Sequence, residues 1–237
     1  MKLFPGLASL AAEPGAVAVI LDVDGTLAPI VARPEDARVP EETRRELRRL
    51  AGRYALVACV SGRARDDVAR LVGVESVEYV GAHGLELHPE AAGWRDRLLA
   101  FAATVDWPVE DKGVTVSFHY RTSTDQAEAR ATLESVAERA RAEGIDARFG
   151  RKVLELRPAV AANKGTAVRA LTESRGLRRA LYAGDDTTDL DAFQALRGLE
   201  LGVTVAVASA EMPEGLAVAA DLVVEGTQGV LELLRKL

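Results

Sequence analysis

Apolar and polar positions divide the chain into segments of two kinds. Unbroken apolar runs at 16–21 and 55–60 are each followed by a charged stretch with apolar residues at helical spacing, at 41–53 and 66–72. The last third repeats this alternation and predicts strands at 180–183, 202–206 and 221–224 and helices at 164–174, 187–196 and 227–237. Strands that are apolar throughout and alternate with helices are typical of a parallel sheet covered on both faces.

The middle of the chain, from about Glu86 to Arg157, has a different pattern. Apolar and polar residues alternate from 114 to 121, and the polar positions are Thr115, Ser117, His119 and Arg121. Such alternation predicts an antiparallel strand with one packed face and one face in water, and helices at 93–103 and 125–143 would cover the packed face. We therefore predict an α/β fold, with a parallel-sheet core at 1–86 and 158–237 and an inserted α+β domain at 87–157.

Composition and charge exclude several classes of protein. The 237 residues include 30 Lys and Arg against 36 Asp and Glu, a net charge of −6, and 5% aromatic residues. An acidic chain with few aromatics is poorly suited to binding nucleic acid through counterion release or base stacking. No apolar run reaches the roughly 20 residues of a membrane span, because Asp22 and Asp24 interrupt the best candidate.

The cysteine count and the first residues indicate the compartment. Cys59 is the only cysteine, and one thiol forms no internal disulfide, which favours a reducing environment. The first twelve residues contain a short apolar stretch, but Pro5 interrupts it, so we expect no signal peptide. We therefore expect a cytoplasmic protein.

Charged and hydroxyl side chains gather where predicted strands end or helices begin. The four segments are Asp22–Leu27, Ser61–Arg63, Asn163–Gly165 and Gly184–Asp189. Because ligands of open parallel sheets bind outside the carboxyl ends of the strands, we expect these segments to meet at one edge.

These segments together indicate phosphoryl transfer. Their carboxylates cannot all ionise without a cation, and the set consists of Asp22, Asp24, Asp185, Asp186 and Asp189. Oxygen ligands beside a phosphate suit Mg²⁺. Lys164, Ser61 and the backbone amides near Gly25 would supply donors for the phosphoryl oxygens.

Each segment also has a purely structural interpretation. The Asp-X-Asp-Gly-Thr run at 22–26 could form a simple turn, Ser61 could cap a helix, and Asp186 or Thr187 could cap the helix that follows. Lys164 could lie on a solvated face. Capping alone explains the four segments poorly when they occur together, in this order, at strand ends and helix starts.

The same four segments resemble the four motifs of the haloacid dehalogenase superfamily. Three further segments narrow the resemblance to its trehalose-6-phosphate phosphatase family, namely Gly81–Glu86, Ser117–Arg121 and Val153–Pro158. The resemblance covers almost the whole chain, although Leu190 stands where relatives often have an acidic residue. It implies a Rossmann-like core and an inserted cap domain of the C2 type.

The resemblance also implies roles for the core residues. Asp22 would be the nucleophile that forms an aspartyl phosphate, and Asp24 would be the general acid and base. Mg²⁺ would bind the Asp22 carboxylate, the Asp24 main-chain carbonyl and Asp185, with Asp186 acting on a coordinated water. Ser61 and Lys164 would hold the phosphate oxygens. Asp189 would support the site by orienting Lys164.

The inserted domain would recognise the sugar. Its candidate residues are Glu110, Lys112, His119, Arg121, Lys152 and Glu155, of which the resemblance favours Glu110, Lys112 and Glu155. The core would add Gly25, Arg63, His83 and Asn163. Charged residues in strands commonly face water, and His119 could simply form a hydrogen bond with a neighbour. For the residues of the inserted domain, a purely structural role therefore remains an alternative to sugar binding.

The expected function is Mg²⁺-dependent hydrolysis of trehalose 6-phosphate to trehalose and phosphate, the last step of trehalose biosynthesis. A related phosphatase for sucrose 6-phosphate or mannosyl-3-phosphoglycerate is an alternative. A non-catalytic sugar-phosphate sensor is another, although both Asp22 and Asp24 are present. We expect a monomer with no membrane partner, and a trehalose-6-phosphate synthase on another chain would supply the substrate.

Overall fold

The computed structural model describes residues 4–31, 33–150, 152–209 and 212–237. Internal contacts divide the chain into two units, Met1–Gly84 with Ala162–Leu237 and Leu85–Ala161. The second unit thus begins at 85 and ends at 161, where the sequence suggested 87 and 157. Each unit has its own sheet and its own hydrophobic core.

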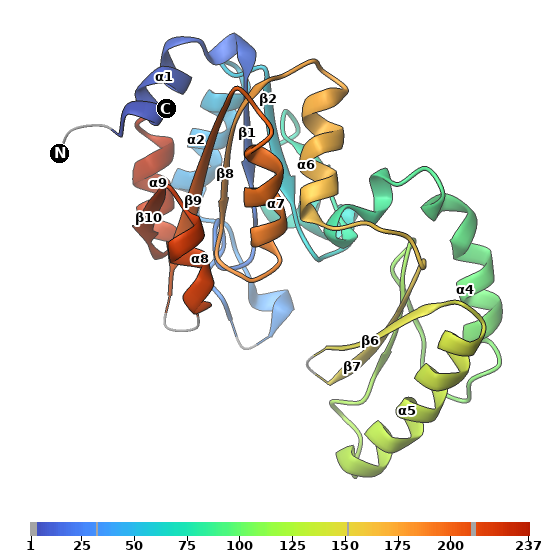
Figure 1. The fold of residues 1–237 in the computed structure, drawn as a ribbon. Coiled ribbons are helices and arrows are strands. Elements are labelled where there is room, and N and C mark those ends of the chain that lie inside the picture. Colours follow the sequence, from blue (N-terminus) through green and yellow to red (C-terminus); the bar gives the residue numbers. More distant parts are fainter. Residues whose placement is uncertain (1–3, 32, 151, 210–211) are drawn as a thin grey trace. The chain divides into compact units, whose positions relative to one another are not determined.

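The first unit contains a six-stranded sheet in which every neighbouring pair is parallel (Figure 1). In spatial order its strands are β10 (Leu222–Glu225), β9 (Leu201–Ala208), β8 (Arg179–Gly184), β1 (Val17–Leu21), β2 (Leu56–Val60) and β3 (Glu78–Val80). The four inner strands are almost wholly buried. The chain order reverses between β1 and β8, and this kind of switch point is where open parallel sheets bind ligands.

Helices cover both faces of this sheet. One core cluster joins the odd positions of β1 to α1 (Pro5–Ala12), α2 (Glu41–Ala51), α3 (Arg65–Val72) and α9 (Gly226–Leu234). The other joins the even positions to α6 (Lys164–Glu173), α7 (Asp189–Leu196) and α8 (Glu214–Ala219). Among the described residues, no helix has both the length and the apolar character needed to cross a membrane.

The sequence patterns missed three short elements of this unit, α1, α8 and β3. In α1, Pro5 begins the helix where it was expected only to interrupt an apolar stretch. Proline is well tolerated at the first helical position, because that N–H has no helical partner. Leu7 and Leu10 then pack into the core, which stabilises a helix of only eight residues.

The second unit contains a four-stranded antiparallel sheet. Its strands, in spatial order, are β4 (Glu110–Asp111), β5 (Val116–His119), β7 (Val153–Arg157) and β6 (Asp146–Gly150). Helices α4 (Arg95–Ala102) and α5 (Gln126–Ala142) contribute to the core on one face, where Phe118 and Leu154 are fully buried. The predicted α/β class, with a second antiparallel sheet, is confirmed.

The opposite face of this sheet differs from the expectation in one respect. Thr115 and Ser117 were predicted to face water, yet they are 1% and 0% exposed. Ser117 lies in register between Glu110 and Glu155, and the Thr115 hydroxyl donates to Glu155 at 3.1 Å. The alternation of apolar and polar residues therefore predicts the face on which a side chain lies but not its exposure.

Candidate active site

The loop after β1 approaches β8 closely. The Asp22 amide continues the parallel ladder by donating to the Ala183 carbonyl at 2.9 Å, and the Asp22 side chain is buried. Gly25 has a φ of +86°, and a Cβ there would overlap the Asp185 carboxylate. Both the left-handed backbone and the lack of space therefore require glycine at this position.

Helix α6 brings Lys164 to the same place. Asn163 caps this helix, because its side-chain oxygen accepts from the Thr166 amide at 2.9 Å while the Thr166 hydroxyl accepts from the Asn163 amide at 3.0 Å. Lys164 is the first helical residue, and its Nζ donates to Asp22 at 2.6 Å and to Asp189 at 2.7 Å. Its side chain is 3% exposed, and the two carboxylates raise its pKa despite burial, so the ammonium stays charged.

Asp189 is held from three directions. Its Oδ1 accepts from Lys164 and from the Tyr182 hydroxyl at 2.7 Å, and its Oδ2 accepts from the Asp186 amide at 2.9 Å. A Cβ at Gly184 would overlap its carboxylate, which explains the glycine before Asp185. Tyr182 was not among the predicted site residues, because it lies inside an apolar strand and nothing in its sequence context marks it.

The buried carboxylates form one cluster. Oxygens of Asp22, Asp185 and Asp189 lie within 4.8 Å of one another, and all three residues are buried. Burial raises the pKa of Asp22 well above its usual range; Lys164 offsets part of this effect and Asp189 adds to it. Burial, with the charge of Asp189, also raises the pKa of Asp185 to about 6. One lysine therefore does not neutralise the cluster.

The donor set fits a hard divalent cation. When Asp22 and Asp185 are both ionised, Lys164 alone does not balance their negative charge. Mg²⁺ favours one or two carboxylate ligands. Asp189 is geometrically close, but both of its oxygens already accept hydrogen bonds, which suits orientation of Lys164 better than metal binding. Asp186 is exposed, and its side chain accepts from the Thr187 amide at 2.6 Å.

Asp24 and Ser61 lie beside Arg63. The Arg63 guanidinium forms a two-point ion pair with Asp24, with Nη2 to Oδ1 at 2.6 Å and Nε to Oδ2 at 2.7 Å. The Arg63 amide donates to the Ser61 hydroxyl oxygen at 3.2 Å, and Ser61 is 1% exposed. Helix α3 begins at Arg65 after Ala64, so Ser61 does not cap it. Among the substrate candidates of this unit, His83 is partly buried and lies against Gly62.

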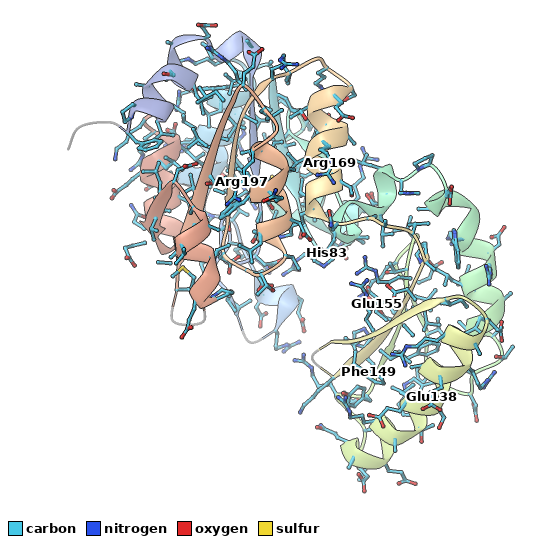
Figure 2. All side chains as sticks on the ribbon, in the orientation of Figure 1. His83, Glu138, Phe149, Glu155, Arg169 and Arg197 are labelled. Carbon is cyan, nitrogen blue, oxygen red and sulfur yellow. The ribbon has the colours of Figure 1, made fainter. Side chains whose placement is uncertain are left out.

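The polar face of the second unit joins four predicted residues. His119 lies 2.6 Å from Glu110, Lys112 lies 3.5 Å from Glu110, and Lys112 lies 4.0 Å from Glu155 (Figure 2 labels Glu155). Partial burial would raise the pKa of Glu110, but the hydrogen bond with His119 and the charge of Lys112 hold it below its usual value. Arg121 is exposed beyond β5, and Lys152, with a φ of +63°, precedes β7.

The sequence of the chain is similar to those of known proteins. The chain matches the family model described as trehalose-phosphatase over residues 20–108 and 102–220. It is 32% identical over 262 residues to a trehalose 6-phosphate phosphatase of Zea mays, covering 96% of this chain and 71% of that protein. It is 37% identical over 215 residues to an uncharacterized glycosyl hydrolase of Mycobacterium tuberculosis, covering 79% of this chain but only 16% of that protein.

Solved structures share the fold. The C-terminal domain of the Candida albicans trehalose-6-phosphate phosphatase matches with a TM-score of 0.67 at 22% identity, covering 97% of this chain and 94% of that one. A haloacid dehalogenase-like hydrolase from Bacteroides thetaiotaomicron matches with a TM-score of 0.63 at 16% identity, covering 92% and 98%. At these identities the likeness concerns the fold alone.

Proposed function

Because the chain belongs to the trehalose-phosphatase family, we propose that it hydrolyses trehalose 6-phosphate to trehalose and inorganic phosphate. The predicted resemblance is confirmed at the level of the family. The observation that supports the proposed reaction most directly is the buried contact of Lys164 with both Asp22 and Asp189, at 2.6 and 2.7 Å. A charge cluster so costly to bury is expected where chemistry needs it.

In the first step Asp22 attacks the phosphorus atom. A bond forms from its carboxylate oxygen to phosphorus as the bond from phosphorus to the sugar oxygen breaks. Lys164 holds the Asp22 carboxylate in one orientation, and Lys164 and the Ser61 hydroxyl hold the non-bridging oxygens. The amides of Gly25, Thr26, Leu27 and Ala28, which the sequence suggested as further donors, instead donate to the Ala28 and Val23 carbonyls within the turn. The product of this step is an aspartyl phosphate and the free sugar.

Asp24 transfers the protons. It donates a proton to the leaving sugar oxygen, and in the second step it accepts one from the water that attacks the aspartyl phosphate. Both of its oxygens accept from Arg63 in the structure, so one of these two contacts has to open before that oxygen carries the proton that Asp24 donates. In this second step the water oxygen bonds to phosphorus as the bond from phosphorus to the Asp22 oxygen breaks, so phosphate leaves, the Asp22 carboxylate is regenerated and Asp24 is protonated again.

Asp22 and Asp185 would hold the divalent cation, with the main-chain carbonyl of Asp24 as a further ligand. When bound, Mg²⁺ would favour the ionised form of Asp22 and offset the charge of the phosphate group. The two buried carboxyls with raised pKa support this assignment, because a cation is what would allow both to ionise. Asp186 is exposed, and it would contact the cation through a water molecule, whereas Asp22 and Asp185 would bind the cation directly.

Sugar hydroxyls need closely spaced donors and acceptors, and the second unit offers them. Glu110, Lys112 and Glu155 form one connected group on its polar sheet face, and His119 extends it. Arg121 and Lys152 lie at the ends of these strands. We assign sugar recognition to this group, with the carboxylates accepting from hydroxyls and Lys112 donating.

Three further assignments belong to the same proposal. A trehalose-6-phosphate synthase would supply the substrate from a separate chain. The enzyme would work as a monomer, which light scattering on the purified protein tests. It would work in a reducing compartment such as the cytoplasm, which is supported by the single free and buried Cys59.

A substrate panel tests the proposal. Phosphate release is measured with trehalose 6-phosphate, sucrose 6-phosphate, mannosyl-3-phosphoglycerate and glucose 6-phosphate, each with Mg²⁺ and with a chelator. We expect the highest kcat/KM for trehalose 6-phosphate and loss of activity with the chelator. A higher kcat/KM for another ester would identify that ester as the substrate instead. Tight binding of trehalose 6-phosphate without release of phosphate in Mg²⁺ would indicate a sensor.

A further inference from the structure

The turn after β3 has an unusual backbone. Ala82, His83 and Gly84 lie one after another in the left-handed region, with φ values of 47°, 55° and 95°. Residues with a Cβ avoid this region, so two of the three are strained there. Such strain persists only where the surroundings determine the conformation, and it is often found at functional sites.

Hydrogen bonds to the loop after β2 hold this turn. The Ala82 amide donates to the Arg63 carbonyl at 2.8 Å, and the His83 amide donates to the Ser61 carbonyl at 2.9 Å. The Ser61 amide donates to the Val80 carbonyl at 3.0 Å. The turn is therefore joined, residue by residue, to the segment that carries the Ser61 hydroxyl and the Arg63 guanidinium.

The His83 ring packs on the middle residue of that segment. A Cβ placed on Gly62 would lie 2.6 Å from His83 Nε2 and 2.7 Å from Cε1, so the ring occupies the space that any side chain at 62 would need. Gly62 is not itself in the left-handed region. Its lack of a side chain thus serves the contact with the ring and not the backbone conformation.

The same turn also touches the start of α6. A Cβ on Gly84 would lie 2.8 Å from the Ala167 Cβ and 2.9 Å from the Asn163 carbonyl. Lys164 is in this first helical turn, and Figure 2 labels His83 near this end of α6. One short segment therefore packs against both elements that carry the proposed phosphate-holding residues, the loop with Ser61 and the helix with Lys164.

We propose that His83 is a positioning residue that acts through Gly62. The left-handed turn presses its ring against the 61–63 loop and so determines where the Ser61 hydroxyl and the Arg63 pair with Asp24 lie. This role rests on the proposed phosphatase function. It differs from direct recognition of the sugar, the role that the sequence suggested for His83, because it depends on the packing of the ring against Gly62.

Two substrates distinguish positioning from recognition of the sugar. We measure kcat and KM of wild type and His83→Ala with trehalose 6-phosphate and with p-nitrophenyl phosphate, which has no sugar. A displaced phosphate-holding loop lowers kcat for both by a similar factor, on the order of tenfold, since small misplacement at the reacting centre is costly. His88→Ala is the matched control, and it should keep the wild-type values for both.

A second set of variants tests the contact itself. Gly62→Ala forces a methyl group against the ring and should lower kcat about as much as His83→Ala. In the double variant the missing ring leaves room for the methyl group, so the loss should be far smaller than the product of the two single losses. Thermal melts of all variants show whether each remains folded.

The outcomes separate this inference from the proposed function. A loss confined to trehalose 6-phosphate in His83→Ala would overturn the positioning role, as would unchanged kcat with both substrates or multiplicative losses in the double variant. A wild-type enzyme that hydrolyses p-nitrophenyl phosphate but not trehalose 6-phosphate would refute the proposed substrate. In that case the p-nitrophenyl phosphate measurements still test His83.

Discussion

The charged side chains proposed for catalysis in the first unit and for sugar recognition in the second are arranged in opposite ways. In the first unit, Lys164 and Asp189 are 3% and 0% exposed, and they bond two and three other residues respectively. In the second unit, Glu110 and His119 are 48% and 52% exposed, although their contact, at 2.6 Å, is as short as that of Lys164 with Asp22. Distance alone therefore does not distinguish the two groups; burial does.

Burial changes what an ion pair can do. In the low-dielectric interior a charge without its partner is strongly penalised, so buried partners hold each other in one geometry. Exposed pairs contribute little to stability and exchange partners with water easily. The first arrangement suits chemistry, which needs fixed atoms, and the second suits recognition of a polar ligand that replaces water.

The largest effect is expected from the nucleophile. Asp22→Asn keeps the shape of the side chain but removes the attacking carboxylate, so phosphate release should fall by at least about a thousandfold. Circular dichroism should stay like that of wild type. Asp191→Asn, a change at an exposed acidic residue on α7, is the control and should keep full activity. Turnover by Asp22→Asn within tenfold of wild type would rule out the covalent mechanism.

Replacing the buried Lys164 tests whether the buried ion pairs contribute more to stability than the exposed ones. Lys164→Met leaves Asp22 and Asp189 without their shared partner, and we expect the free energy of unfolding to fall by about 3–5 kcal/mol. Urea denaturation at pH 7.5 measures this change. Arg178→Ala breaks the exposed pair with Glu200 and should cost less than about 1 kcal/mol. Equal losses in both variants would remove the distinction between buried and exposed pairs.

The acidic cluster should also make stability depend on pH. The folded-state pKa of Asp185 is raised to about 6, above its unfolded value of about 4. The stabilisation from its protonated form is thus complete below about pH 4 and is lost as pH rises through about 6. Without metal, the melting temperature should fall over this interval.

Added Mg²⁺ should reverse that trend. Metal binding requires the ionised carboxylates, so Mg²⁺ should raise the melting temperature more at pH 7.5 than at pH 5. Asp185→Asn should lose most of both effects, and differential scanning fluorimetry in buffers with Mg²⁺ or a chelator measures them. A Mg²⁺ effect that is greater at pH 5 would contradict the assignment of this cluster as the metal site.

The smallest effects are expected from the exposed group. Lys112→Ala should raise KM for trehalose 6-phosphate by about three- to thirtyfold, the cost of one or two hydrogen bonds to a ligand, and should leave KM for p-nitrophenyl phosphate unchanged. Its free energy of unfolding should change by less than about 1 kcal/mol. Glu138→Gln, on the exposed side of α5, should change neither value. Equal KM changes with both esters would argue against sugar recognition.

Much of the fold could be predicted because it depends on local patterns. The apolar runs that became β1 and β2 are buried on both faces, and such strands need no information from elsewhere in the chain. The elements that were missed depend on tertiary contacts. Helix α1 is short and owes its stability to Leu7 and Leu10 against the core, and β3 is a three-residue strand at the sheet's edge.

The candidate site could be predicted as a set of residues but not as a network. Strand ends pointed to Asp22 and Asp185, because parallel strands present their carboxyl ends together, and the start of a predicted helix pointed to Lys164. The resemblance implied that Asp189 orients Lys164, and Lys164 Nζ donates to Asp189 at 2.7 Å, but the other partners were not readable. Tyr182 looked like any apolar strand residue, and Arg63 looked like a substrate ligand before it was found paired with Asp24.

By itself, the sequence determined the alternation of strands and helices, the insertion of an antiparallel segment and the chemical nature of the four motif segments. These properties follow from periodicity and residue type, which are local. Tertiary structure alone decided that Lys164 bonds Asp22, 142 residues away, that Asp189 is enclosed by donors and that Thr115 and Ser117 are covered. The energy of a polar group depends on what surrounds it, and its surroundings come from distant parts of the chain.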